Sequence, residues 1–367
     1  MATRPVTVRI LHPDPGPAAG PLERWVSSAR AELAERHRVA FLEAGATDVA
    51  LLGGPPDDTP FGARLREIVR VDRPAGLVIL GSGAVPLATN RDYRELVTAA
   101  GVEGREALAN NRFSADVVAI ACAELLSDVP DLPGDNALPR WLEEVAGYQL
   151  RDLSGRWRLA FDIDGPLDLV LLGDTNAPAG VDAGPIRRRI TAVRAVAADR
   201  RAELVVSGRV SVRTLAWLER GIPARVRAIV EERGLRAASR LAQKPPSDAR
   251  VTTTTRPPAS LLGAMLERDG PGALGEVLAR LGEAAIVDTR VLLAHRLGAD
   301  ERAWPVPEER FASDLLLPDR VEDRWLRELT TAAVKAPIPI LLGGHSLVGP
   351  GVRLLLGRHP FASPSWS

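Results

Sequence analysis

The fold is decided by residues 157–173, which read Trp-Arg-Leu-Ala-Phe-Asp-Ile-Asp-Gly-Pro-Leu-Asp-Leu-Val-Leu-Leu-Gly. Residues 157–163 are predicted to form a strand, a Gly-Pro turn follows, and Asp168 opens an apolar helix, where free N–H groups favour an acid. Side chains alternate along a strand, so we expect Asp162 and Asp164 on one face. Their oxygens can then converge on one divalent cation. An acidic corner without a metal is the alternative interpretation.

Outward from this stretch, the first half of the chain alternates between apolar strands and segments with helical periodicity. The predicted strands are residues 6–11, 48–52, 76–80 and 115–121, and the predicted helices are residues 22–44, 61–71, 139–146 and one that ends at residue 100. Such alternation predicts an α/β domain with a mainly parallel, helix-covered sheet.

The second half repeats this alternation after a segment rich in Gly, Pro, Ala and Asp, residues 174–184, which we interpret as a connector. Strands are predicted at residues 202–206, 284–287 and 338–342, and helices at residues 187–201, 212–242 (two helices), 261–281 (with breaks), 291–297 and 320–336. Residues 244–258 hold two Pro-Pro pairs and four consecutive threonines, which predicts an exposed loop. The expected organisation is a first α/β domain (1–175), a connector and helix (176–200) and a second, smaller α/β domain (201–367).

The composition of the chain argues against several classes of protein. The chain has 367 residues, which is enough for two cores, and its net charge of zero argues against a nucleic-acid partner. The single Cys122 excludes a disulfide framework and a cysteine-rich zinc site. No apolar run reaches transmembrane length and no signal-peptide pattern is present, so we expect a cytoplasmic protein without a membrane partner. Lys244 and Lys335 are the only lysines, so a phosphate site would use arginine forks or backbone amides.

Two features resemble a known family: the loop that ends in Pro86-Leu87 before a helix, and the Asp-Ile-Asp-Gly-Pro-Leu-Asp-Leu corner at residues 162–169. Together they resemble the nucleotidyltransferases of the glycosyltransferase-A-type fold, in particular the molybdenum cofactor guanylyltransferases and the 2-phospho-L-lactate guanylyltransferases. The similarity covers about residues 1–173. It implies a Rossmann-like sheet, Mg²⁺ held by the acidic corner, and transfer of a nucleoside monophosphate to a phosphorylated small molecule.

The resemblance also points to the residues that recognise the acceptor. They lie in residues 110–116 and 135–141, and the candidates for substrate contact are Asn110, Asn111, Arg112, Asp135 and Asn136. Amides can hydrogen-bond a base or sugar, and a guanidinium can pair with a phosphate. The alternatives are a turn for the Asn-Asn-Arg triplet and a helix N-cap for the Asp-Asn pair.

The sequence departs from the family at two positions. The basic, glycine-rich loop that holds the triphosphate is absent after the first strand, where residues 12–20 contain prolines that remove amide donors. Ala84 also stands where the family has an acid. A domain that binds a nucleotide or sugar nucleotide without catalysing transfer is therefore the second hypothesis, and no catalytic residue is assigned.

A third hypothesis places a ligand site in the second domain. Three predicted strands there end in polar loops, and ligands of open parallel sheets lie beyond the carboxyl ends of the strands. Arg209 and Arg290 supply forked donors, and glycines permit close backbone approach. The expected phosphate or carboxylate site comprises Arg209, Arg290, Gly343, Gly344, His345 and Ser346. A Ser-His-Asp triad built from these loops is disfavoured, because adjacent residues rarely face each other and no nucleophile elbow is present. No motif in the sequence specifies the base of the nucleotide, the acceptor substrate or the oligomeric state of the protein.

Overall fold

The computed structural model describes residues 4–55, 57, 59–132, 134–231 and 259–357. They divide into two units, which are described separately: Met1–Ala19 with Val26–Ile163, and Gly20–Trp25 with Asp164–Ser367. The chain thus leaves the first unit between the two acids of the 157–173 stretch.

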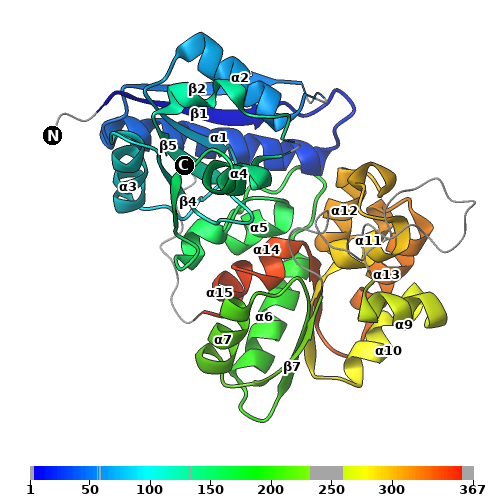
Figure 1. The fold of residues 1–367 in the computed structure, drawn as a ribbon. Coiled ribbons are helices and arrows are strands. Elements are labelled where there is room, and N and C mark those ends of the chain that lie inside the picture. Colours follow the sequence, from blue (N-terminus) through cyan, green and yellow to red (C-terminus); the bar gives the residue numbers. More distant parts are fainter. Residues whose placement is uncertain (1–3, 56, 58, 133, 232–258, 358–367) are drawn as a thin grey trace, which may run out of the picture. The chain divides into compact units, whose positions relative to one another are not determined.

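The first unit contains a mixed six-stranded sheet in the order β2-β1-β3-β5-β4-β6 (Figure 1). Its strands are β1 (Val6–Pro13), β2 (Asp48–Gly54), β3 (Gly76–Gly81), β4 (Glu106–Ala109), β5 (Val117–Ala121) and β6 (Gln149–Asp152). β1 runs parallel to both β2 and β3, and β4 runs parallel to β6. β5 is antiparallel to its neighbours β3 and β4. The sheet is therefore mainly parallel, with one reversed strand.

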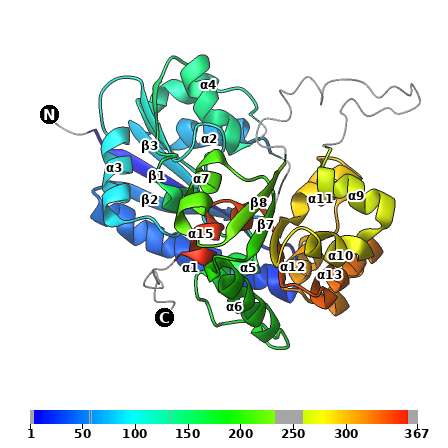
Figure 2. The ribbon, with the colours of Figure 1, turned by 90° about the horizontal axis from the view of Figure 1, so that it is seen from below.

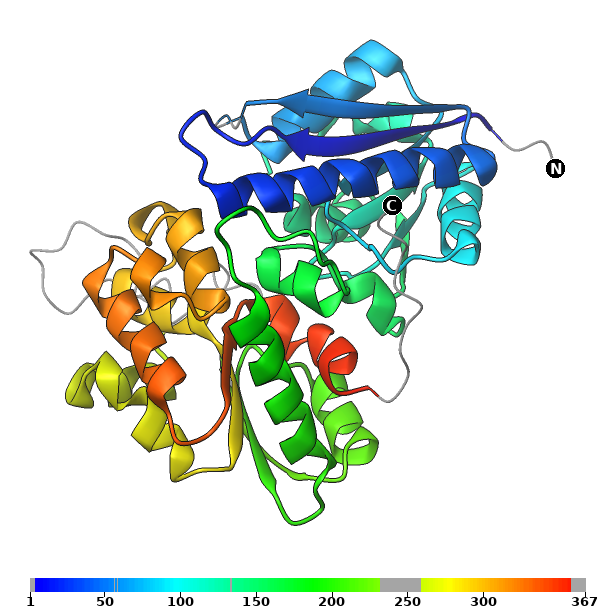
Figure 3. The ribbon, with the colours of Figure 1, turned by 180° about the vertical axis from the view of Figure 1, so that it is seen from behind.

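Helices cover both faces of this sheet because the strand side chains alternate. Val8 and Val78 belong to one buried cluster, together with residues of α1 (Pro21–Glu43) and α3 (Asn90–Ala100). Leu77 and Ile79 face the other cluster, which includes residues of α2 (Phe61–Asp72) and α4 (Leu138–Glu144). The long blue helix α1 runs alongside β1 and β2 in Figure 3. The central strands β1, β3 and β5 thus bury side chains on both faces, as expected for a helix-covered sheet, whereas the edge strands β2 and β6 are partly exposed.

The strand predicted at residues 157–163 is wrong. Trp157–Ala160 form a short 3-10 helix, in which the N–H of Leu159 donates to the carbonyl of Arg156 at 2.9 Å. Local hydrogen bonds of this kind occupy the backbone groups that a sheet ladder needs. The short strands β4 and β6 had not been predicted. Other 3-10 helices span Ala123–Asp128, Asp135–Ala137, Pro271–Ala273, Glu301–Ala303 and Pro318–Arg320.

The second unit contains a parallel four-stranded sheet in the order β10-β9-β7-β8. Its strands are β7 (Glu203–Gly208), β8 (Arg225–Val230), β9 (Ala284–Asp288) and β10 (Ile340–Gly343). Its helices are α5 (Pro166–Leu171), α6 (Gly184–Ala198), α7 (Val212–Gly221), α9 (Leu261–Asp269), α10 (Leu274–Ala279), α11 (Thr289–Leu297), α12 (Pro307–Asp314), α13 (Arg324–Lys335), α14 (His345–Val348) and α15 (Gly351–Leu356). Figure 2 shows α9 to α13 gathered in one cluster.

Three elements of this unit differ from what was predicted. Arg225–Val230 form strand β8 where a helix was expected, since Arg225 and Arg227 alternate with apolar residues at an exposed sheet edge. Helix α12 had not been predicted, and the helix expected over residues 320–336 spans Arg324–Lys335. The rest of the second helix expected up to residue 242 and the loop expected at 244–258 lie outside the described residues. Among the helices described, none is long and apolar enough to cross a membrane.

Candidate functional site

In the first unit, the strand order reverses between β1 and β3. After β1 the chain crosses to β2 on one side and then returns to β3 on the other. Ligands of α/β sheets bind beyond the carboxyl ends of the strands at such a reversal. The residues that follow these two strand ends are therefore the first candidates for a site.

A buried histidine–serine pair lies at this reversal. His12 Nδ1 is 2.9 Å from Ser82 Oγ, and the N–H of Ser82 donates to the carbonyl of Leu11 at 2.8 Å. Burial lowers the pKa of His12 below its usual value; nearby Asp14 opposes this shift and Arg30 adds to it. The sequence interpretation missed this pair. The available signal was one polar side chain at the end of each of two apolar strands.

The acidic corner reaches the loop that follows β3. The N–H of Ile163 donates to the carbonyl of Gly83 at 2.9 Å, and Arg30 Nε donates to the carbonyl of Ile163 at 2.7 Å. A Cβ atom on Gly83 would lie 3.0 Å from that carbonyl oxygen and 2.9 Å from Arg30 Nε, so glycine eases this close approach. Asp162, the neighbour of Ile163, thus belongs to the segment held beside the β1–β3 reversal.

The two acids of the corner alternate with buried apolar side chains, as predicted, although no strand is present. Phe161 and Ile163 are fully buried, whereas Asp162 is half-buried and Asp164 is exposed. Two carboxylates with access to solvent are a donor set that suits Mg²⁺, which keeps several waters and binds few protein oxygens. Mg²⁺ binding stays a prediction.

Asp168 has a different role from the other two acids. As predicted, it lies in the first turn of α5, where its carboxylate accepts hydrogen bonds from the N–H groups of Asp164 at 2.9 Å and Gly165 at 2.8 Å. Ser346 Oγ donates to its other oxygen at 2.5 Å. Burial, and then the charge of Asp164, raises the pKa of Asp168 to about 7. Because the side chain is buried, it positions the corner and does not face a ligand.

Asn110 joins the carboxyl end of β4 to the start of β5. Its Nδ2 donates to Asp116 Oδ2 and to the carbonyl of Leu159, both at 2.8 Å, and its Oδ1 accepts the N–H of Asp116 at 2.9 Å. Asn111 Oδ1 accepts the N–H of Phe113 at 2.9 Å, which is the hydrogen bond of an Asx turn. Asn111 thus makes the contact of a turn, whereas the buried Asn110 holds the ends of β4 and β5 and residue 159 together. Contact of either amide with substrate stays a prediction.

Arg112 is held by acids of helix α4. Its Nη2 is 2.8 Å from Glu143 and 3.4 Å from Glu144, and its Nε is buried without a hydrogen-bond partner among the described residues. The N–H of Arg112 also donates to Asp152, at the carboxyl end of β6. This arginine therefore lies at the same edge of the sheet as the β1–β3 reversal, with its charge already balanced.

The Asp-Asn pair does not cap helix α4 as the alternative interpretation proposed. Asp135 begins a 3-10 helix, and the N-cap of α4 is Ala137, which has no capping side chain. Pro139 does lie in the first turn. Asp135 is half-buried and accepts the N–H of Asn136 at 2.8 Å, and burial raises its pKa.

In the second unit, the three polar loops lie at one edge of the sheet because they follow neighbouring parallel strands. Its strand order also reverses, between β7 and β9, and there Arg209 Nε binds Asp288 Oδ2 at 2.7 Å. Arg290 forms a two-pronged pair with the buried Asp314, at 2.7 and 2.5 Å. Each arginine of the expected anion site is thus matched by a buried carboxylate.

The remaining residues of that expected site are mostly engaged in packing. A Cβ atom on Gly343 would lie 2.7 Å from the side chain of Leu347, so this glycine serves a close internal contact. Gly344 is the N-cap of α14, which begins at the half-buried His345. Ser346 is buried against Asp168. Anion binding at this edge stays a prediction.

No protein-family model and no curated protein sequence matches this chain.

Proposed function

We propose that the chain is a nucleotidyltransferase-like protein whose first unit has a glycosyltransferase-A-type fold and binds a nucleotide at the carboxyl edge of its sheet. One observation carries the proposal: the backbone of the acidic corner is hydrogen-bonded to the loop after β3, at the strand reversal where α/β sheets bind ligands. The mainly parallel sheet agrees with the fold that the family resemblance implies.

In this proposal Asp162 and Asp164 hold Mg²⁺, which when bound would neutralise negative charge on the phosphates. Asn111, Arg112 and Asp135 contact the substrate. The reaction joins a nucleoside monophosphate to a phosphorylated small molecule. An oxygen of the acceptor attacks the α-phosphorus, the bond from that phosphorus to the bridging oxygen breaks, and pyrophosphate leaves. Positioning and charge neutralisation supply most of the catalysis of such transfers.

The alternative is a domain that binds a nucleotide without transferring it. It is favoured by the prolines of residues 12–20, which reduce the number of amide donors available to a triphosphate. It is also favoured by Ala84, which is buried at the position where the family has an acid. The two proposals differ in whether binding requires the metal.

Thermal-shift measurements and calorimetry with ATP, GTP, CTP and UTP, with and without Mg²⁺, test the proposal on the full chain. The double variant Asp162→Asn/Asp164→Asn should lose the metal-dependent stabilisation. The double variant Asp128→Asn/Asp319→Asn is the matched control, because both acids are exposed.

Each outcome discriminates among the proposals. Metal-dependent binding that only the corner variant loses supports the transferase, and binding that is indifferent to Mg²⁺ supports the non-catalytic alternative. If no nucleoside triphosphate binds, the transferase is refuted, and the non-catalytic alternative is refuted as well if sugar nucleotides such as UDP-glucose also fail to bind. If only phosphorylated metabolites bind and His345→Ala abolishes this binding, the site lies at the carboxyl edge of the second unit instead.

A further inference from the structure

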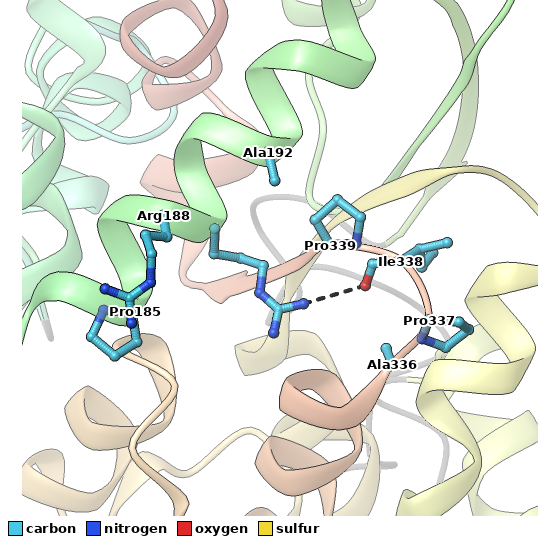
Figure 4. A pocket seen from close by; sticks show the side chains of 8 residues that line it. Pro185, Arg188, Ala192, Ala336, Pro337, Ile338 and Pro339 are labelled. Atoms are coloured by element: carbon cyan, nitrogen blue, oxygen red, sulfur yellow. Dashed lines mark hydrogen bonds between the residues drawn. The ribbon is translucent and has the colours of Figure 1, made fainter.

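The second unit contains a pocket beside the amino end of β10. It has a volume of about 410 Å³ and opens between the first turns of α6 and the segment that leads into β10. Its lining residues are Pro185, Arg188, Arg189, Ala192, Ala336, Pro337, Ile338 and Pro339 (Figure 4). This volume lies within the range of small-molecule sites.

Two arginines give this pocket positive charge. The half-buried Arg189 uses its guanidinium on backbone carbonyls: Nη2 donates to Val334 at 2.9 Å and Nη1 to Ile338 at 3.3 Å. Burial lowers its pKa because the cation loses hydration without gaining a carboxylate. Arg188 is exposed, and among the described residues neither guanidinium forms an ion pair with an acid. Asp182 Oδ1 does lie near Arg188 Nη1, since the two atoms would be 2.9 and 3.1 Å from a Cβ atom on Gly184. None of the eight lining residues is acidic.

The rest of the wall is apolar and poor in hydrogen-bond donors. Figure 4 shows Arg188 beside Pro185 at one end of the pocket, and Ala192 near Pro339 at the other. Pro337 and Pro339 have no N–H, so this segment offers few amides to a ligand. A phosphate dianion generally requires several donors, whereas one guanidinium fork satisfies a carboxylate in two parallel hydrogen bonds.

We propose that this pocket binds an organic monocarboxylate with a compact apolar body. Arg188 pairs with the carboxylate, Arg189 adds unbalanced positive charge, and the proline, alanine and isoleucine side chains cover the apolar part. The site is distinct from the proposed nucleotide site, because none of the residues that line it is assigned to that site. Its ligand is an aromatic or branched aliphatic acid.

Calorimetry on the full chain with phenylacetate and 4-methylpentanoate tests this inference. Phenylacetamide serves as the uncharged analogue and inorganic phosphate as the competing class of anion. Arg188→Met keeps an unbranched, flexible stem and removes the guanidinium and its charge, so the Kd for phenylacetate should rise about tenfold or more. Ala192→Trp fills the pocket and should abolish binding while both arginines remain. Arg200→Met, an exposed arginine just beyond the end of α6, is the matched control and should leave the Kd unchanged.

The proposal is supported if a carboxylate binds, the amide binds at least tenfold more weakly, and both pocket variants lose affinity while keeping the circular dichroism spectrum of the parent. If neither acid binds, the proposal is overturned. If the acids bind both pocket variants as tightly as the parent, the ligand site does not lie in this pocket. If phosphate binds more tightly than the acids, the ligand is not a carboxylate. None of these outcomes depends on whether a nucleotide binds the first unit.

Discussion

The buried His37 should make the stability of the first unit depend on pH. Its Nε2 donates to the carbonyl of Ala84 at 2.8 Å, so Nδ1 accepts from the hydroxyl of Tyr93 at 2.9 Å and the ring is neutral. Burial lowers the pKa of His37 from 6.5 to about 4, against the opposing effect of the Ala84 hydrogen bond. The unfolded chain therefore binds the proton more readily than the folded chain between these two values.

The difference between the pKa of His37 in the folded and in the unfolded chain sets the sign and the size of the change in stability with pH. Stability due to neutral His37 is fully present above pH 6.5 and is lost as the pH falls toward 4. Since one pKa unit corresponds to about 1.4 kcal/mol, the free energy of unfolding should fall by about 2.5 kcal/mol between pH 7.5 and pH 4.5 through this group alone. His37→Gln lacks the titrating ring and should lack this part of the pH dependence, although it should cost about 1–3 kcal/mol at pH 7.5.

Guanidinium-induced unfolding at several pH values measures the effect, with pulsed hydrogen exchange on peptides of α1 and α3 to follow the first unit. The difference in stability between parent and His37→Gln should shrink as the pH falls. His295→Gln, in the second unit, is the control and should leave the pH dependence of these peptides unchanged. Equal losses for the parent and His37→Gln between pH 7.5 and pH 4.5 would refute the reasoning.

Three further predictions concern stability and are measured by chemical unfolding at pH 7.5. Asn110→Ala should cost about 2–4 kcal/mol, because it leaves several buried backbone partners without their hydrogen bonds; a loss under 1 kcal/mol would contradict this. Arg290→Met should cost about 3–5 kcal/mol by leaving Asp314 buried and unpaired, and the double variant with Asp314→Leu should recover part of that loss. Gly62→Ala should cost about 1–3 kcal/mol, because its Cβ would lie 1.8 Å from a backbone oxygen, whereas Gly134→Ala has open space and should be neutral.

Long apolar segments were the part of the fold that could be predicted. The strands expected at residues 6–11, 76–80 and 284–287 occur, because a run buried on both faces is visible in composition alone. The strand expected at residues 48–52 also occurs, although it lies at an edge of its sheet. Strands β6 and β8 were missed since edge strands bury little and carry polar residues. Their pairing energy comes from a neighbouring strand that is distant in the sequence.

The same distinction applies to the candidate site: features that depend on adjacent residues could be predicted, and contacts between distant segments could not. The alternation of Asp162 and Asp164 with apolar neighbours could be predicted, because it depends on adjacent residues. The contact between His12 and Ser82 could not, since it requires β1 and β3 to be neighbours in the sheet. The carboxylate partners of Arg209 and Arg290 could not be predicted either. These carboxylates balance the positive charge that the expected anion site would use.

By itself, the amino-acid sequence determined the α/β class, the positions of most buried strands and the acidic corner, because short-range periodicity and turn chemistry encode them. Only the tertiary structure decided the order of the strands, and with it which polar side chains meet at the two strand reversals and which charges are already neutralised. Strand order results from packing between segments far apart in the chain, and no local pattern records it.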